Sequence, residues 1–92
     1  MKTRITEDSK RVLGRVLSSP YKSRIIEALM GTNDGLPAST LMQKSGALSD
    51  GSFFYHLRDL ERLNLISHNS DYTLTEFGHQ IAQELSNLYL NA

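Results

Sequence analysis

The sequence has no cysteine and no tryptophan, and it has only two prolines among its 92 residues. Without cysteine, the chain has no disulfide framework and no thiolate metal site. No apolar run approaches the roughly 18 residues that a membrane-spanning helix needs. The polar stretch from Met1 to Lys10 lacks the apolar segment of a signal peptide. This composition favours a soluble, cytoplasmic protein with no membrane partner.

The chain has no excess of charge of either sign, because ten basic and ten acidic residues give a net charge of zero. The distribution along the chain is uneven. Residues 1–24 hold seven Lys and Arg against two acids, a balance of +5, and residues 25–92 hold three against eight, a balance of −5. The basic groups can therefore gather near one surface and attract a polyanion. Ordinary charge scatter over solvated helices explains the same numbers equally well.

The first half of the chain predicts three helices. Apolar residues at helical spacing mark a helix from about residue 7 to 17. Ser19 is a good cap for a second helix, which Pro20 opens and Gly31 ends. Leu36 is expected in a strand of one or two residues. A short third helix is expected from about Pro37 to residue 45.

The most informative segment runs from Leu48 to Ile66 and predicts a fourth helix. Ser49 is a suitable N-cap, and Asn64 tolerates the left-handed conformation just past a helix end. The apolar positions of this helix fall on one side at about 100° per residue. They are Phe53, Leu57 and Leu60, and the opposite side carries Gly51, Tyr55, Arg58 and Arg62. Small, aromatic and cationic groups on one exposed side suit a helix that enters a major groove.

The last third predicts a β-hairpin and a long helix. Residues 65–67 and 72–74 are the expected strands, and Thr75 is the expected cap of the final helix. The apolar stripe of that helix exceeds what a small core needs, which indicates contact with a second subunit. The fold class is mainly α with a small β-hairpin, in one domain. Its predicted parts are an N-terminal helix over 6–18, a winged-helix core over 19–75 and a dimerisation helix over 75–91.

Three segments resemble the winged helix-turn-helix of arsenic-repressor-like (ArsR-like) transcription regulators. Residues 19–29 are similar to the opening helix of that family, with its paired Ile and following Leu. Residues 48–66 match the helix that ends in His-Leu, a later Leu-Glu and a Leu-Ile exit. Residues 72–78 match the Tyr-x-Leu-Thr-x-x-Gly end of the wing. The likeness covers about residues 19–80, and it implies a homodimer that binds double-stranded DNA and regulates transcription.

The sequence also departs from that family. Asn64 stands where family members usually have Gly, and the expected wing contains neither Arg nor Lys. Contacts from the wing would have to come from His68, Asn69 or Ser70. The Cys motif of the metal-sensing members is missing, so no metal regulation is inferred.

These patterns predict two sets of functional residues. Two helices joined by a turn with Gly form a helix-turn-helix, in which the first helix crosses the phosphates and the second reads bases. The predicted DNA-binding residues are Ser39, Thr40, Lys44, Gly51, Ser52, Tyr55, Arg58, Arg62, His68 and Asn69. The predicted dimer-interface residues are Val12, Val16, Ile81, Leu85, Leu88 and Tyr89.

Some alternatives stay open. The basic residues of the N-terminal helix either extend the phosphate footprint or lie in water beside a dimer seam. His56 is expected to pack and hydrogen-bond, and the acids are expected on solvent-facing helix positions. No catalytic arrangement, cofactor, metal or small-molecule effector is indicated. A winged-helix protein–protein interaction module, without specific DNA binding, is the rival function.

Overall fold

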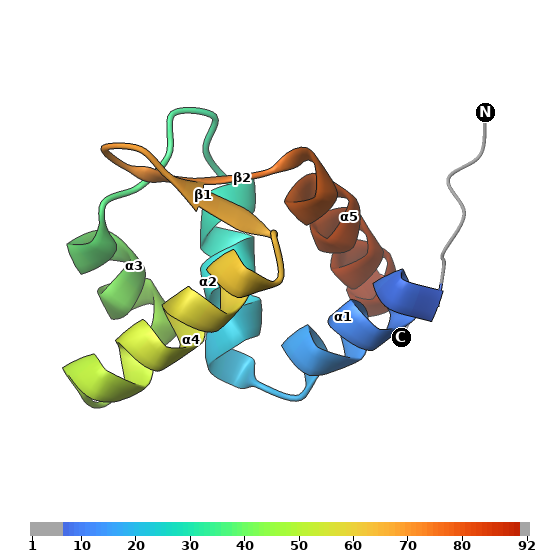
Figure 1. Cartoon of the computed structure of the whole chain (residues 1–92), viewed down its shortest axis with the longest axis horizontal. Coiled ribbons are helices and arrows are strands. Elements are labelled where there is room, and N and C mark those ends of the chain that lie inside the picture. Colours follow the sequence, from blue (N-terminus) through green and yellow to red (C-terminus); the bar gives the residue numbers. More distant parts are fainter. Residues whose placement is uncertain (1–6, 91–92) are drawn as a thin grey trace.

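The computed structural model describes residues 7–90, with side chains to residue 88. The predicted fold class is confirmed: within this range the chain forms five helices and one antiparallel hairpin, in the order of a winged helix-turn-helix (Figure 1). The elements are α1 (Glu7–Leu17), α2 (Pro20–Met30), α3 (Ala38–Ser45), α4 (Asp50–Arg62), β1 (Ile66–His68), β2 (Tyr72–Leu74) and α5 (Glu76–Leu90). None of these helices is long and apolar enough to cross a membrane.

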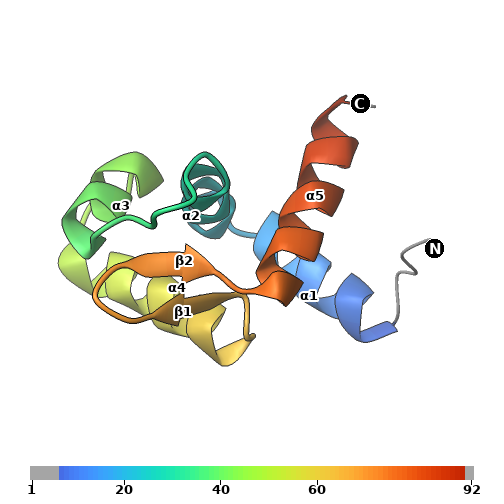
Figure 2. The ribbon, with the colours of Figure 1, turned by 90° about the horizontal axis from the view of Figure 1, so that it is seen from above.

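Helix α2 lies at the centre of the molecule and contacts α1, α3, α4, α5 and β2. Figures 1 and 2 show the hairpin lying along α4, and α5 standing beside α1 at the end of the body away from α3. One apolar core joins these elements, and its members come from α1 through α5. The largest fully buried side chains include Val16, Ile25, Ile26, Leu29, Leu41, Phe53, Leu57, Leu60, Leu65, Ile81 and Leu85.

The predicted helix caps are present. Ser19 Oγ accepts the backbone N–H of Lys22 at 3.2 Å, and Ser49 Oγ accepts that of Ser52 at 3.1 Å. Thr75 Oγ1 accepts the N–H of Gly78 at 2.9 Å. Each hydroxyl satisfies a first-turn donor that has no partner within its helix. Pro37 differs slightly from expectation, since it is the residue before α3 and not its first residue.

Asn64 ends α4 in the way its sequence predicts. Its φ of 64° is left-handed. The Leu65 N–H donates to the Leu60 carbonyl at 3.0 Å, and the Asn64 N–H donates to the Glu61 carbonyl at 2.9 Å. This pair of bonds is the Schellman motif, which satisfies carbonyls at a helix end and turns the chain sharply. The turn leads directly into β1.

The hairpin pairs Ile66 with Leu74 and His68 with Tyr72. Its first strand is one residue later than the predicted 65–67, because Leu65 belongs to the turn after α4. Leu36 forms the predicted short bridge, exchanging two backbone hydrogen bonds of 2.9 and 3.0 Å with Tyr72. The hairpin is therefore tied both to the α2–α3 loop and to the end of α4.

Three predicted dimer-interface residues are instead part of the chain's own core. Val16 is fully buried, and Ile81 and Leu85 are each 2 % exposed. The interface prediction is wrong for these residues, because α1 and α5 pack on α2 and on each other and leave them no free surface. Val12 is half-buried against the same core. The side chain of Tyr89 lies outside the described part of the chain, and Leu88 is 46 % exposed.

Gly78 permits the first turn of α5 to lie directly on the backbone of Leu65. A Cβ at this position would approach the Leu65 carbonyl oxygen within 2.0 Å. That contact is impossible without movement of the backbone. The Gly in the motif of residues 72–78 is thus required by the close approach of α5 to the start of the hairpin.

Replacing Gly78 with Ala should destabilise the protein by about 1–3 kcal/mol or more, because the added methyl overpacks a backbone contact. Urea unfolding followed by circular dichroism measures the change. Gly14→Ala is the matched control, since nothing lies within 4 Å of its Cβ position in α1. That control should stabilise the protein by about 0.5–1 kcal/mol through helix propensity. Equal effects at the two positions would contradict the packing argument.

Candidate nucleic-acid interface

The face of α4 that the sequence predicts to be outward is uncovered. Gly51, Arg58 and Arg62 are exposed, and the side chain of Tyr55 is 55 % exposed. The other side of the helix holds Phe53, Leu57 and Leu60 in the core. The exposure of these residues shows that neither the hairpin nor any other described part of the chain covers this face. The amphipathic assignment of α4 is therefore confirmed.

The two arginines on this face differ in their partners. Arg58 makes no ion pair or hydrogen bond with any described residue. Arg62 Nη1 lies 4.0 Å from Asp59 Oδ1, a long and exposed contact that stabilises little. Tyr55 is more constrained, since Lys22 Nζ lies 5.2 Å from its ring centroid and the His56 ring lies edge-on at 5.1 Å. The guanidinium of Arg58 is accordingly the cation most available to a ligand on α4.

The N-terminal end of α4 is less suited to phosphate than its glycine suggests. The N–H of Ser52 already donates to Ser49 Oγ, and Asp50 places a carboxylate in the first turn. A carboxylate near the helix N-terminus interacts favourably with the dipole and repels a second anion. Gly51 and Ser52 therefore sit at a helix end that disfavours phosphate oxygens.

Helix α3 and the hairpin supply the remaining predicted residues. Ser39 and Lys44 are exposed on α3, and Thr40 is half-buried. At the hairpin, His68 and Asn69 are exposed. The His68 ring stacks on Tyr72 with centroids 4.0 Å apart, which holds one face of the imidazole against the hairpin.

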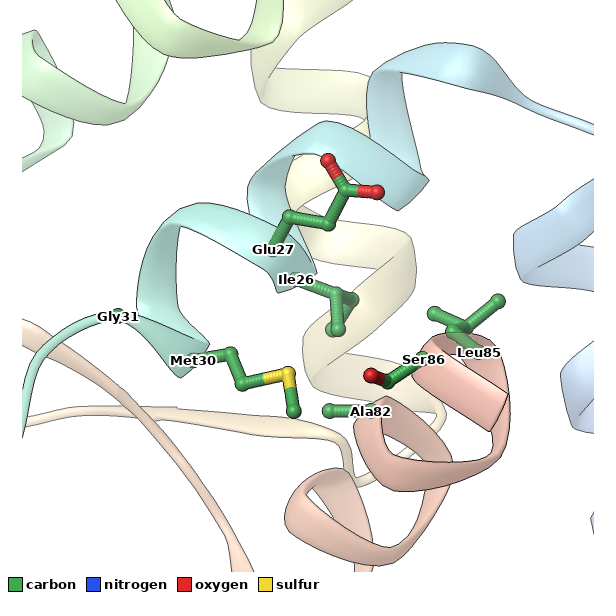
Figure 3. A pocket seen from close by; sticks show the side chains of 7 residues that line it. All are labelled: Ile26, Glu27, Met30, Gly31, Ala82, Leu85 and Ser86. Atoms are coloured by element: carbon green, nitrogen blue, oxygen red, sulfur yellow. The ribbon is translucent and has the colours of Figure 1, made fainter. Parts of the chain in front are cut away.

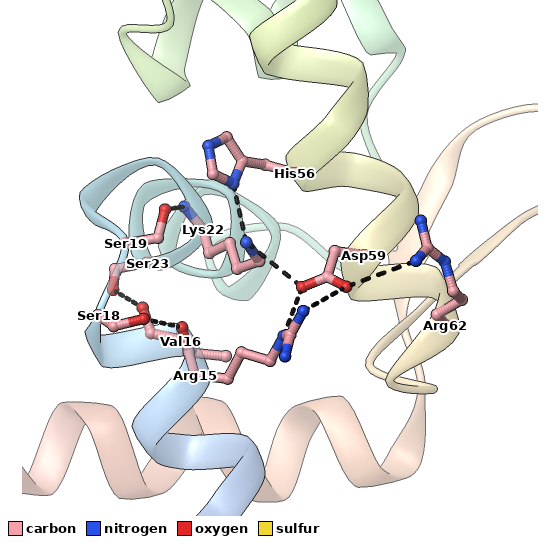
Figure 4. Close-up of polar contacts among 9 residues, drawn as sticks. All are labelled: Arg15, Val16, Ser18, Ser19, Lys22, Ser23, His56, Asp59 and Arg62. Carbon is pink, nitrogen blue, oxygen red and sulfur yellow. Dashed lines mark hydrogen bonds and ion pairs between the residues drawn. The ribbon is translucent and has the colours of Figure 1, made fainter.

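A buried charge cluster connects α1, α2 and α4 behind this face (Figure 4). Its centre is Asp59, whose side chain is 4 % exposed, beside Lys22, whose side chain is 5 % exposed. Lys22 Nζ lies 3.3 Å from Asp59 Oδ2 and 2.8 Å from His56 Nδ1. Arg15 Nε donates to Asp59 Oδ2 at 2.8 Å, and its Nη2 donates to Oδ1 at 3.3 Å. Every polar group of the cluster thus has a partner.

The cluster corrects the expectation that all acids face solvent. Asp59 lies on neither the apolar stripe nor the outward face of α4, and it is buried because α1 and α2 pack over it. Sequence periodicity shows only the position of a residue on its own helix. One feature of the sequence could have suggested a buried acid: two cations, Arg15 and Lys22, flank the short connection between the first two helices.

The cluster shifts the pKa of two groups. The hydrogen bond from Arg15 lowers the pKa of Asp59, against the opposing effect of burial, and Lys22 lowers it further. Burial lowers the pKa of His56 below 6.5, and the charge of Lys22 adds to this effect. Neutral His56 accepts a hydrogen bond at Nδ1 from the Lys22 ammonium group. Its contribution to stability is present above pH 6.5 and is lost as the pH falls through the lower folded-state pKa.

The basic residues of α1 are mostly engaged within the chain. Lys10 Nζ lies 3.8 Å from Glu7, and Arg11 Nη2 lies 2.8 Å from Asp8. Arg15 is held by Asp59, as described above. These pairs reduce the positive field that the charge distribution predicted for α1. Lys2 and Arg4 lie outside the described residues.

An apolar groove of about 340 Å³ runs between α2 and α5, on another side of the molecule (Figure 3). Ile26, Met30, Ala82 and Leu85 form its apolar part. Glu27 stands at one rim with its carboxylate turned away from Ala82 (Figure 3). The groove is therefore a mainly apolar surface, and no buried charged side chain among its lining residues points into it.

Comparison with known proteins gives one match. The model of a family described as a domain of unknown function (DUF7347) matches residues 13–85. No curated protein and no solved structure matches the chain significantly. The matched range extends from α1 into α5 and therefore includes α4, the hairpin and the buried charge cluster.

Replacing Asp59 with Asn should cost about 3–5 kcal/mol, because Lys22 would then be buried without a counter-charge. Chemical denaturation at pH 7 measures the loss. Asp8→Asn is the matched control, since it breaks an exposed i,i+3 pair with Arg11. The control should change stability by about 0.5 kcal/mol or less. A loss at Asp59 no larger than at Asp8 would contradict the structural role of the cluster.

Proposed function

The chain belongs to the DUF7347 family, and we propose that this member is a sequence-specific double-stranded DNA-binding regulator of transcription that acts as a homodimer. The observation that carries the proposal is the uncovered face of α4, with Tyr55, Arg58 and Arg62 on a helix whose other sides are fixed by the core and the charge cluster. In the simplest mode the bound dimer represses transcription. The ArsR-like resemblance of the sequence agrees with this proposal.

Helix α4 has the dimensions and chemistry for major-groove recognition. Its 13 residues span about 20 Å, and a major groove admits one such helix. Arg58, which makes no ion pair or hydrogen bond with any described residue, would donate two hydrogen bonds to a guanine edge. Arg62, one turn further along, meets a phosphate and sets the register without reading sequence.

The elements beside α4 supply positioning contacts. Ser39, Thr40 and Lys44 on α3 approach the sugar–phosphate backbone, as expected of the first helix of a helix-turn-helix. His68 and Asn69 lie at the hairpin and reach a neighbouring backbone or groove edge. The hairpin carries no Lys or Arg, so its share of the affinity is small.

The proposed dimer rests on α5. With Ile81 and Leu85 in the core, Leu88 is the large apolar residue that α5 exposes within its described side chains. Figure 2 shows the C-terminal half of α5 projecting beyond the other elements, where a second copy has access to it. Two recognition helices in successive major grooves would read a pseudo-palindromic site with half-sites about one helical turn apart.

A protein-interaction module is the second candidate, and two observations favour it. The hairpin contains no Lys or Arg. The cations of α1 that the structure describes are all in ion pairs. This function predicts little affinity for any duplex and no steep loss of binding with added salt.

Selection of bound fragments from random double-stranded DNA, at two ionic strengths, separates the two functions. A DNA-binding dimer should enrich a two-fold symmetric sequence and should bind it less tightly at the higher ionic strength. No enrichment at either ionic strength would reject the proposal and favour the interaction module.

Replacing Arg58 with Ala should weaken binding to the selected site by about 1–3 kcal/mol and relax the preference at one base pair. Fluorescence anisotropy with duplexes that vary one base pair at a time measures both effects. Arg11→Ala on α1 is the charge-matched control, with little expected effect on base preference. Unchanged binding by the Arg58 variant would show that this face of α4 does not meet bases.

Replacing Leu88 with Asp should convert the dimer to a monomer, because it places a charge at an apolar contact. Analytical ultracentrifugation measures the mass. Asn87→Asp adds the same charge one residue earlier on the exposed side of α5, and it should leave the dimer intact. A Leu88 variant that stays dimeric would place the interface elsewhere.

A further inference from the structure

Leu48 has no role in the fold although it is a large apolar residue. It is 96 % exposed, whereas the other exposed aliphatic side chains, Leu88, Leu17 and Met30, are 46, 44 and 40 % exposed. A Leu left in water forgoes the hydrophobic stabilisation that burial would give it. Single exposed apolar residues are common. The distinguishing feature of Leu48 is its position, directly before the N-cap of α4.

Leu48 precedes the cap residue of α4, a position that commonly packs against the fourth helical residue as a hydrophobic staple. In α4 that partner is Phe53. Phe53 is fully buried and has an edge contact with Phe54 at 5.1 Å between ring centroids, while Leu48 remains in solvent. The staple is therefore absent, and the fold leaves the side chain of Leu48 free at the tip of the recognition helix.

The surroundings of this tip fit a base edge flanked by phosphates. The space beside Gly51 is open, since nothing lies within 4 Å of its Cβ position. Asp50 disfavours a phosphate at the helix end itself, whereas a carboxylate accepts a hydrogen bond from a cytosine amino group. Behind the tip, Arg24 Nη1 donates to the Ser45 carbonyl at 3.3 Å, and Lys44 is exposed. Both cations lie near the turn between α3 and α4, where they are available to phosphates beside the groove.

We propose that Leu48 is a specificity-determining residue, whose side chain packs against the 5-methyl group of a thymine in the major groove. Thymine is the base that presents an apolar group on that edge of B-DNA. Contact removes both the methyl group and the Leu side chain from water, and so favours A·T at one position of each half-site. The inference rests on the proposed DNA-binding function and adds a base that Arg58, Arg62 and Tyr55 do not read.

The test replaces each thymine of the selected duplex in turn with deoxyuridine, which lacks only the methyl group. The affinities of the wild-type protein and the Leu48→Ala variant are measured for each duplex. At one position per half-site, wild-type binding should weaken about fourfold, the value expected for one buried methyl group. The Leu48→Ala variant should be insensitive to that replacement.

Leu17→Ala is the matched control, because Leu17 is an exposed Leu on α1. It should keep the wild-type response to deoxyuridine. Both variants should keep the wild-type melting temperature, since neither side chain is in the core. Wild-type affinity and the same deoxyuridine response in Leu48→Ala would overturn the inference while the DNA-binding function stands. A wild-type protein that binds no duplex would reject the function and the inference together.

Discussion

The buried pairing of Asp59 with Lys22 is the contact on which the orientation of α4, and with it the proposed recognition surface, depends. Both side chains are almost fully removed from water, so each charge needs the other. The pair fixes α4 to α2 on a side that the apolar stripe does not reach, and Arg15 brings α1 to the same carboxylate. With two sides of α4 held in this way, its rotation about its own axis is set and one face is left for a ligand.

The hairpin is held directly against the end of α4 by hydrogen bonds. Thr75 donates through Oγ1 to the Asn64 carbonyl at 2.7 Å and through its N–H to the Leu65 carbonyl at 3.0 Å. Gly78 then lets α5 begin against the same turn. The end of α4, the hairpin and the start of α5 therefore act as one unit. The side chains proposed to meet DNA are thus held in place in the free protein, and such preorganisation reduces the entropy lost on association.

These internal ion pairs leave fewer free positive charges on the surface. Lys22 and Arg15 neutralise Asp59, and the exposed cations of α1 pair with acids in the same helix. Any attraction to a duplex through the described residues then comes from a few exposed groups on α2, α3 and α4, such as Arg24, Lys44 and Arg58. If the proposed function holds, so little general attraction to phosphate means that affinity depends more on base contacts than on electrostatics.

The sequence by itself determined the local features: the caps at Ser19, Ser49 and Thr75, the left-handed end at Asn64, the two sides of α4, and the order of helices and hairpin. Short-range backbone hydrogen bonds and helical periodicity cause these features, and both can be read from neighbouring residues. Only the tertiary structure decided that Asp59 is buried, that Val16, Ile81 and Leu85 fill the core, and that Leu48 stands in solvent. Those outcomes depend on which helix covers which side of another, and residues far apart in the chain set that geometry.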